Sequence, residues 1–139
     1  MGSKGKGTRA ERELLHMFWE TGTWAAIRSP GSGSTPLPSP DILAGDGKKR
    51  YLAIECKSLK EKRKYFDQDE INQLLEFSKK FGAEPWVAVR FDKVGWYFFP
   101  PYELIKGKKN FVVSMKHAEK KGLNFNELIG VFRQSKLNF

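Results

Sequence analysis

The stretch that most constrains the fold is residues 40–57, in which two short apolar runs flank a Gly-Asp-Gly break. This pattern predicts a β-hairpin, and the alternation of the second run predicts a strand with Glu55 and Lys57 on one face. A hairpin centred on Lys48 places Asp41 opposite Glu55, with Cβ atoms about 5 Å apart. Two carboxylates at that separation can share a divalent cation and repel each other without one.

The alternative interpretation of this hairpin is a solvated strand face that carries two acids and a lysine. Glu and Lys are depleted in strand interiors, yet here they close a hydrophobic run. We therefore favour a metal site, in which oxygen ligands suit Mg²⁺ and we expect Mn²⁺ to substitute. Protonated Lys57 cannot be a ligand, so it either orients an attacking water or neutralises phosphate oxygens in the transition state.

The chain before the hairpin predicts an amphipathic helix. Thr8 and Glu11 have the spacing of a capping box, and Gly22 marks the helix end. Glu11 also precedes the apolar stripe by three and four residues, so it can be a cap residue, a site residue or both. Residues 1–7 are expected to form a flexible leader. Its two lysines, Lys4 and Lys6, and the following basic residue, Arg9, are candidates for DNA binding. The apolar stripe comprises Leu14, Leu15, Phe18 and Trp19.

Residues 30–40 join a predicted strand at residues 24–29 to the hairpin, and they contain four prolines, two glycines and four hydroxyl residues. This composition predicts a flexible loop without regular pairing. Its hydroxyls and amides are placed to bind phosphates, and the alternative is a plain linker. Residues 58–64 are a basic run that either tracks a nucleic-acid backbone or forms a solvated face; its candidates for DNA binding are Lys60, Lys62 and Arg63.

The second half of the chain predicts further helices and strands. Asp67 or Asp69 caps a helix that ends at Gly82, and residues 86–91 and 95–99 form two strands. Because residues 96–99 are four consecutive aromatics, we favour a subunit interface there over core packing on both faces. The remaining predictions are an apolar stripe on the helix at Ile71, Leu74, Leu75, Ser78 and Phe81, a short edge strand at residues 111–114, a last helix capped by Asn124 or Asn126, and a frayed tail at residues 134–139.

Composition restricts the function. The 139 residues suit one domain, and 25 Lys and Arg against 16 Asp and Glu give a net charge of +9, which favours a polyanion such as nucleic acid. The single cysteine excludes an internal disulfide and, with no apolar run of membrane-spanning length, suggests a protein of the reducing cytoplasm. A basic surface with an acid-held metal and a lysine suits phosphodiester hydrolysis better than glycosyl transfer.

The spacing of Asp41 and Glu55-Cys56-Lys57 resembles the D…(D/E)xK motif of the restriction-endonuclease-like nuclease superfamily. The wider pattern is similar to the archaeal Holliday junction resolvases of the Hjc type. The resemblance covers residues 5–99 and is carried by segments 10–14, 28–29, 40–45, 54–57, 75–82 and 94–96. The chain differs from the simplest members by a Pro-rich insert in the Gly/Ser loop and a longer, more basic segment at residues 115–121.

The resemblance implies an α/β fold with a central mixed sheet of about five strands flanked by helices. It also implies a two-fold homodimer and Mg²⁺-dependent paired nicking of four-way (Holliday) junction DNA, in association with other recombination or replication proteins. The location that it implies is prokaryotic and nucleoid-associated. By position, its site residues fall on Glu11, Asp41, Glu55 and Lys57, its phosphate-binding groups on Arg12, Arg28 and Ser29, and its loop serine on Ser32 or Ser34. We assign Ser34 to catalysis and Ser32 to DNA binding. The candidate metal ligands are Glu11, Asp41, Glu55 and the backbone carbonyl of Cys56.

Three other functions remain open at this point. One is a general or restriction-type DNA nuclease, which would cut linear duplex as well as junctions. The second is a non-catalytic junction-binding module. The third is a subunit of a repair complex, which would be active only when its partner is added. Cleavage of four-way and linear DNA, with and without divalent metal, separates these possibilities.

Overall fold

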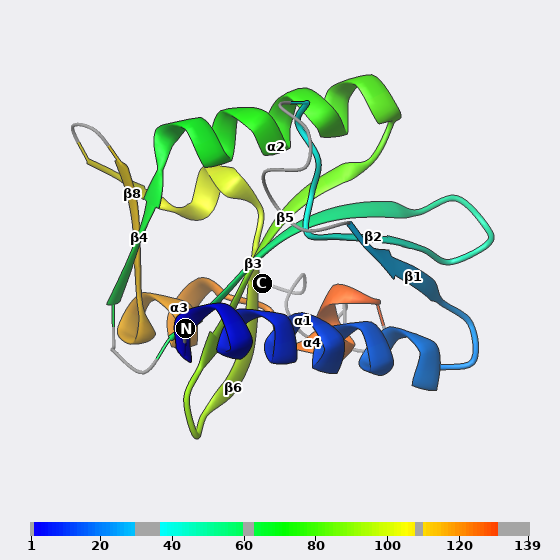
Figure 1. The fold of residues 1–139 in the computed structure, drawn as a ribbon, viewed down its shortest axis with the longest axis horizontal. Coiled ribbons are helices and arrows are strands. Elements are labelled where there is room, and N and C mark those ends of the chain that lie inside the picture. The colour runs from blue at the N-terminus through cyan, green and yellow to red at the C-terminus, as the bar shows by residue number, and fades with distance from the viewer. Residues whose placement is uncertain (1, 30–36, 60–62, 108–109, 131–139) are drawn as a thin grey trace.

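The computed structural model describes residues 2–29, 37–59, 63–107 and 110–130, and its elements are arranged around a five-stranded sheet (Figure 1). None of the helices in these ranges is both long and apolar enough to span a membrane. The helices are α1 (Gly2–Glu20), α2 (Gln68–Phe81), α3 (Met115–Lys121) and α4 (Phe125–Leu128), with a 3₁₀ turn, η1 (Pro101–Glu103). The strands are β1 (Ala25–Arg28), β2 (Ile42–Gly45), β3 (Tyr51–Leu59), β4 (Arg63–Asp67), β5 (Glu84–Phe91), β6 (Gly95–Phe99), β7 (Ile105–Lys106) and β8 (Asn110–Ser114).

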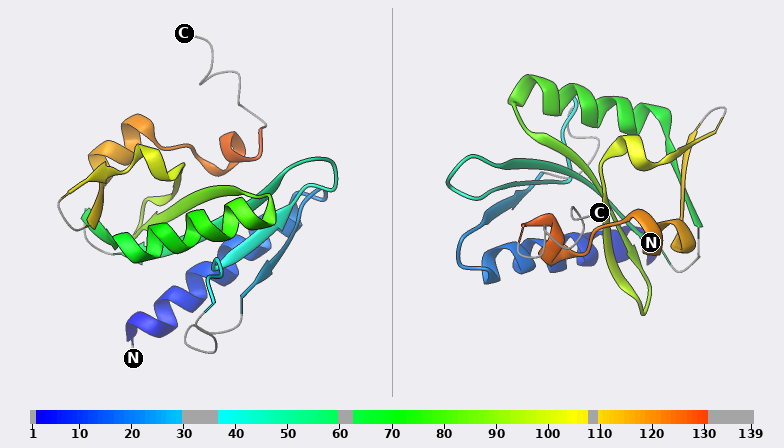
Figure 2. Two further views of the ribbon diagram at one scale, coloured as in Figure 1. Left: turned by 90° about the horizontal axis from the view of Figure 1, so that it is seen from above. Right: turned by 180° about the vertical axis from the view of Figure 1, so that it is seen from behind.

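The main sheet has the order β1-β2-β3-β5-β6, in which only the β3–β5 pair is parallel. The predicted mixed sheet flanked by helices is therefore confirmed. α1 and α4 lie on one face of the sheet and α2 on the other (Figure 2). Because both faces are covered, β3 and β5 are buried on both sides, which is typical of parallel central strands.

Two apolar clusters hold these layers together. Phe18 of α1 packs with Ile54 of β3 and Phe98 of β6 on one face, and all three side chains are fully buried. On the other face Ile71 of α2 packs with Val87 of β5. Full burial of each such side chain contributes about 1.5–3 kcal/mol. The core thus fixes the position of β3, the strand that carries Glu55 and Lys57.

The first helix begins earlier than the sequence suggested. Its backbone is helical from Gly2, so Thr8 is an interior residue and the capping-box interpretation of Thr8 and Glu11 is wrong. Residues 2–7 continue this helix, and their flexibility stays a prediction. Once Leu14 and its neighbours anchor the helix, adding turns costs less than nucleating one. The helix ends before Gly22, as expected, with Gly22 in the left-handed region.

The second helix matches its prediction at both ends. Asp67 is its N-cap and Gly82, in the left-handed region, follows its last residue. The apolar stripe is only partly buried: Ile71 is buried, but Leu75 is 42% exposed and Phe81 is 53% exposed. These two side chains lie outside the buried part of the stripe, which comprises Ile71, Leu74 and Ser78.

The strand at residues 95–99 is part of the core, and its interpretation as a subunit interface is wrong. Phe98 and Phe99 are fully buried, and Trp96 is 9% exposed. Phe98 contacts Phe125 of α4, with ring centroids 6.2 Å apart, and Phe99 stacks on His117 of α3 at 5.7 Å. The two C-terminal helices therefore cover the aromatic side chains that a smaller domain would expose.

A second, three-stranded sheet has the order β4-β8-β7. β4 was not predicted, because a basic run precedes it and its partner lies far along the chain at residues 110–114. β8 is the middle strand of this sheet, so its prediction as an edge strand is wrong. β4 leads directly into α2 and thereby places the start of that helix beside β3.

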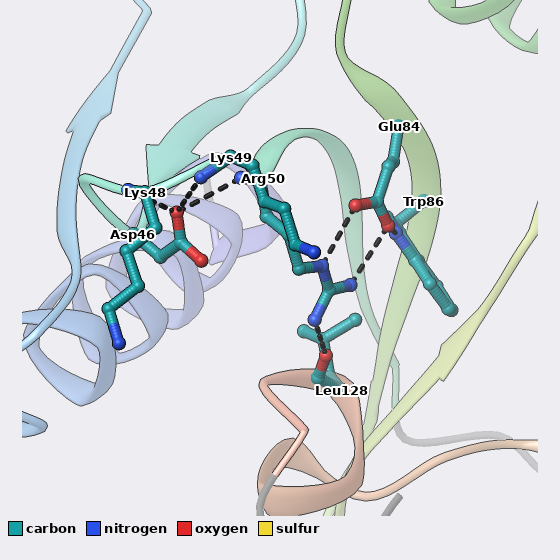
Figure 3. Close-up of polar contacts among 7 residues, drawn as sticks. All are labelled: Asp46, Lys48, Lys49, Arg50, Glu84, Trp86 and Leu128. Carbon is teal, nitrogen blue, oxygen red and sulfur yellow. Dashed lines mark hydrogen bonds and ion pairs between the residues drawn. The ribbon is translucent and has the colours of Figure 1, made fainter.

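The tip of the β2–β3 hairpin is held by Asp46 and Arg50 (Figure 3). One carboxylate oxygen of Asp46 accepts hydrogen bonds from the backbone N–H groups of residues 48–50 at 2.8–3.0 Å. The Arg50 guanidinium donates two 2.8 Å hydrogen bonds to Glu84 of β5 and one of 2.7 Å to the Leu128 carbonyl of α4. Through the bidentate pair with Glu84 and the separate bond to Leu128, Arg50 ties the start of β3 to β5 and α4 at one end of the sheet.

Candidate active site

Asp41 lies directly before β2 at the other end of the hairpin. Its backbone N–H donates to the carbonyl of Ile54 at 2.9 Å, and Ile42 pairs with Ile54, which is the predicted register. Its side chain accepts a 2.8 Å hydrogen bond from the backbone N–H of Cys56. The hairpin thus brings the Asp41 carboxylate to the strand segment that carries Glu55.

Asp41 and Glu55 form a desolvated pair of acids. Burial and the negative charges of Asp41 and Glu70 raise the pKa of Glu55 to about 9. Burial also raises the pKa of Asp41, although the hydrogen bond from Cys56 opposes this shift. Among the described residues, neither acid forms an ion pair with a basic side chain. Two adjacent acids that hold a proton in this way are suited to exchange it for a cation.

The donor atoms around this pair fit a magnesium ion, which binds through few protein carboxylates and keeps several waters. The described ranges contain no group of three or more His, Cys, Asp and Glu side chains placed to hold a metal ion. A further oxygen donor is the backbone carbonyl of Cys56. In a strand, the N–H and C=O of one residue point to the same edge, and the Cys56 N–H points toward Asp41. The Cys56 thiol is buried in the core and takes no part.

Glu11 approaches this site from α1. Its carboxylate accepts a hydrogen bond from Arg28 Nε at 3.2 Å, which joins α1 to the end of β1. Burial and the charge of Asp41 raise the pKa of Glu11, while Arg28 lowers it. Glu11 is therefore close enough to Asp41 for the charge of Asp41 to affect its pKa. Its carboxylate forms an ion pair with Arg28.

Lys57 lies two residues after Glu55 on the same strand. Its ammonium nitrogen is 2.5 Å from Oε2 of Glu70, the third residue of α2, and 5.9 Å from the ring centroid of Phe66. Burial pushes the pKa of Lys57 down, but the hydrogen bond and charge of Glu70, with the nearby Asp41 and Glu55, outweigh it and raise the pKa. Lys57 is therefore a fixed positive charge next to the acid pair.

Glu70 is the site residue that sequence reasoning missed. The spacing of Asp67 and Glu70 is that of a capping box, and Glu70 does accept a hydrogen bond from the Asp67 N–H at 3.1 Å. That signal places Glu70 at the start of a helix. It gives no sign that β4 brings this helix start to Lys57.

The predicted DNA-binding residues are distributed over several elements. Arg9 and Arg12 are exposed on α1. The Ser29 hydroxyl donates to the carbonyl of Pro40 and its N–H donates to the carbonyl of Asp41 at 3.0 Å, so Ser29 closes the base of the loop at residues 30–40. Lys4 and Lys6 lie on α1 and Arg63 on β4, with only their backbones described, whereas Ser32, Ser34, Lys60 and Lys62 and the tail at residues 134–139 lie outside the described residues.

Comparison with known proteins identifies the family of this chain. The family model for archaeal Holliday junction resolvase (Hjc) matches residues 2–137, well beyond the segment 5–99 that carried the resemblance. The crossover junction endodeoxyribonuclease Hjc of Archaeoglobus fulgidus is 45% identical over 133 residues, 96% of each chain. The Hjc of Methanocaldococcus jannaschii is 32% identical over 133 residues, 96% of this chain and 93% of its own.

A solved structure agrees with the sequence comparison. The 1.6 Å structure of Archaeoglobus fulgidus Hjc, described as a Holliday junction resolvase from an archaeal hyperthermophile, superimposes with a TM-score of 0.82. The match has 44% identity and covers 89% of this chain and 100% of that one. The resemblance inferred from the motifs is thus confirmed, and the chain belongs to the archaeal Holliday junction resolvase (Hjc) family.

Proposed function

We propose that this chain is a structure-selective DNA endonuclease that resolves four-way junctions by metal-dependent phosphodiester hydrolysis in two opposed strands. The observation that carries the proposal is the half-buried pair of Asp41 and Glu55 next to Lys57, in a chain of the Hjc family. Its relatives from Archaeoglobus and Methanocaldococcus are named crossover junction endodeoxyribonucleases, which supports the same activity here.

The residues that would hold Mg²⁺, or Mn²⁺ in its place, are Asp41, Glu55 and the carbonyl of Cys56, with Glu11 completing the acidic wall. The metal makes a bound water more acidic and stabilises negative charge on the phosphate. Lys57, held at the side of the pair by Glu70, either orients the attacking water or neutralises the phosphate oxygens.

Binding of the junction would rest on phosphate contacts and shape. The chain carries a net charge of +9, and Arg9 and Arg12 are exposed on α1. Such contacts position DNA without reading its sequence. We therefore expect binding to depend strongly on salt and little on base sequence.

The decisive experiment compares cleavage of a four-way junction with cleavage of a linear duplex of the same sequence, with and without Mg²⁺. We expect two nicks in opposed strands of the junction, little cutting of the duplex and no cutting without metal. Equal cutting of both substrates would point to a general nuclease. Binding without cutting, in either Mg²⁺ or Mn²⁺, would make the protein a junction-binding module.

We also propose that the chain acts as a homodimer, because two symmetric cuts need two identical sites at a fixed separation. A candidate surface is an apolar groove of about 360 Å³ between α2, the start of β5 and η1. Leu75, 42% exposed, and Tyr102, 83% exposed, line it. The groove is otherwise lined by Ile71, Glu84, Pro85, Trp86, Pro100, Pro101 and Phe111. Exposed apolar patches of this kind mark sites of association, and a second copy is the partner that the symmetric reaction requires.

Sedimentation tests this surface. Leu75→Glu and Tyr102→Glu place charge in the groove and should convert a wild-type dimer to monomers. Tyr51→Glu is the matched control, because Tyr51 is an exposed aromatic residue, 51% accessible, on β3 outside the groove. A dimer that survives both groove substitutions would rule this face out as the interface.

A further inference from the structure

Glu70 connects the start of α2 to the candidate active site. One of its carboxylate oxygens, Oε1, accepts from the backbone N–H of Asp67 at 3.1 Å. The other, Oε2, lies 2.5 Å from the ammonium of Lys57. The hydrogen bond from Asp67 holds the Glu70 carboxylate at the start of the helix, and the contact with Lys57 holds the lysine ammonium against that carboxylate. Both side chains of the ion pair are about three-quarters buried, with exposed fractions of 26% and 28%.

The position of Lys57 needs such a restraint. A lysine has a flexible four-carbon stem, and the negative charge of Asp41, together with that of Glu55 when Glu55 is ionised, acts on this one. An ammonium that moved onto these two acids would neutralise them and compete with a divalent cation for the same oxygens. Glu70 supplies a carboxylate on α2 that attracts the ammonium away from the acid pair, and Lys57 forms its ion pair with Glu70.

We propose that Glu70 is a positioning residue of this nuclease: it holds the Lys57 ammonium beside the Asp41–Glu55 pair and so leaves the pair free for a metal ion. The inference rests on the proposed function, and in it Glu70 acts through Lys57. Its negative charge also acts directly on Asp41 and Glu55. The part of its effect that comes from positioning must therefore disappear when Lys57 is absent.

The test is a double-mutant cycle in single-turnover cleavage of a four-way junction with Mg²⁺. Glu70→Gln is expected to lower the cleavage rate on the order of 10²-fold, the cost of a misplaced group. Junction affinity without metal should not change. Lys57→Ala should lower the rate by a similar or larger factor, and the double variant should be no slower than Lys57→Ala alone.

Magnesium binding gives a second readout that does not depend on cleavage. Mg²⁺ should raise the Tm of the wild type more than that of Glu70→Gln. In the Lys57→Ala background this difference should become much smaller, because no ammonium remains to compete and only the direct charge effect of Glu70 is left. A difference of the same size in both backgrounds would mean that Glu70 acts on the metal by its own charge and would overturn the proposal.

Two further variants separate positioning from helix capping and from general charge. Asp67→Ala damages the cap at the same helix end but keeps the Asp67 N–H and the Glu70–Lys57 pair. Glu76→Gln removes an acid on the same helix that pairs with Lys80, 2.9 Å away. Both should cut at close to the wild-type rate. If Asp67→Ala is as slow as Glu70→Gln, the effect is one of capping and the proposal fails.

The proposal and the proposed function fail differently. A wild-type protein that cuts no junction refutes the function, whereas a Glu70→Gln variant that cuts as fast as wild type refutes only the role of Glu70. If Glu70→Gln does not fold, Glu70→Asp carries the test. It keeps a charge at the helix start but is one methylene too short for Lys57, so it should also be slow.

Discussion

The backbone N–H of Cys56 donates a 2.8 Å hydrogen bond to Oδ2 of Asp41. The strand that carries Glu55 thereby holds the acid of the neighbouring strand in place. The Asp41 side chain therefore both accepts a hydrogen bond and can carry a negative charge, and a substitution can remove the charge while keeping the hydrogen bond.

Asp41→Asn is the substitution that separates them, because the amide oxygen of Asn can still accept the hydrogen bond from Cys56. We expect a folded protein whose Tm is no lower than that of the wild type and whose junction affinity is unchanged. Its cleavage rate should fall by at least about 100-fold, since even indirect partners of a metal cost 10–100-fold when removed. Single-turnover cleavage and gel-shift binding measure the two effects. Cleavage at the wild-type rate would exclude Asp41 from the metal site.

The pKa of Glu55 makes stability depend on pH when no metal is present. The folded protein keeps a proton on Glu55 up to about pH 9, whereas the unfolded chain releases it near the ordinary value of 4.5. Between these values the folded state binds more protons, so stability falls as pH rises. Glu55→Gln has no proton to lose and should therefore be more stable than wild type near pH 8, with a smaller advantage near pH 5.

Thermal unfolding in a chelator measures this difference. We expect Glu55→Gln to raise the Tm near pH 8 by at least about 3 °C, the shift that 1 kcal/mol produces in a chain of this size. Adding Mg²⁺ should stabilise the wild type and not the variant. Identical melting of the two proteins at both pH values would contradict a strained acid pair.

The sequence predicted the part of the site that depends on local pattern. A Gly-Asp-Gly break and the alternation after it fix the hairpin register, so the proximity of Asp41 and Glu55 followed without the fold. The N-cap and end of α2 followed from Asp67 and Gly82 for the same reason. Such signals act over a few residues and survive in most tertiary contexts.

The contacts that depend on distant segments could not be predicted. The ion pair of Lys57 with Glu70 requires β4, and β4 is a strand only because it pairs with β8. The burial of the β6 aromatics requires α3 and α4, whose sequences are short and ambiguous. Arg28 and Glu11 meet only because α1 packs on β1. In each case the stabilising contacts are made with a segment that is distant in the sequence, so the pattern of neighbouring residues does not reveal them.

The corrected position of β6 leads to a stability prediction. Phe98 is fully buried between α4 and the sheet, so Phe98→Ala should lower the free energy of unfolding by about 3–5 kcal/mol. Tyr51→Ala is the control, since Tyr51 is 51% exposed and should cost far less. Denaturant unfolding measures both values. A Phe98→Ala protein of near wild-type stability that fails to dimerise would restore the interface interpretation.

The exposed arginines of α1 lead to a prediction about DNA binding. If Arg12 contacts a phosphate, Arg12→Gln should weaken junction binding about equally for all sequences, because phosphates are the same at every step. It should also reduce the slope of log K against log salt by about 1. Lys48→Gln removes the same charge at the hairpin tip, at the opposite end of β2 and β3 from Asp41, and should leave the slope unchanged. Equal slopes for Arg12→Gln and wild type would remove Arg12 from the DNA-binding surface.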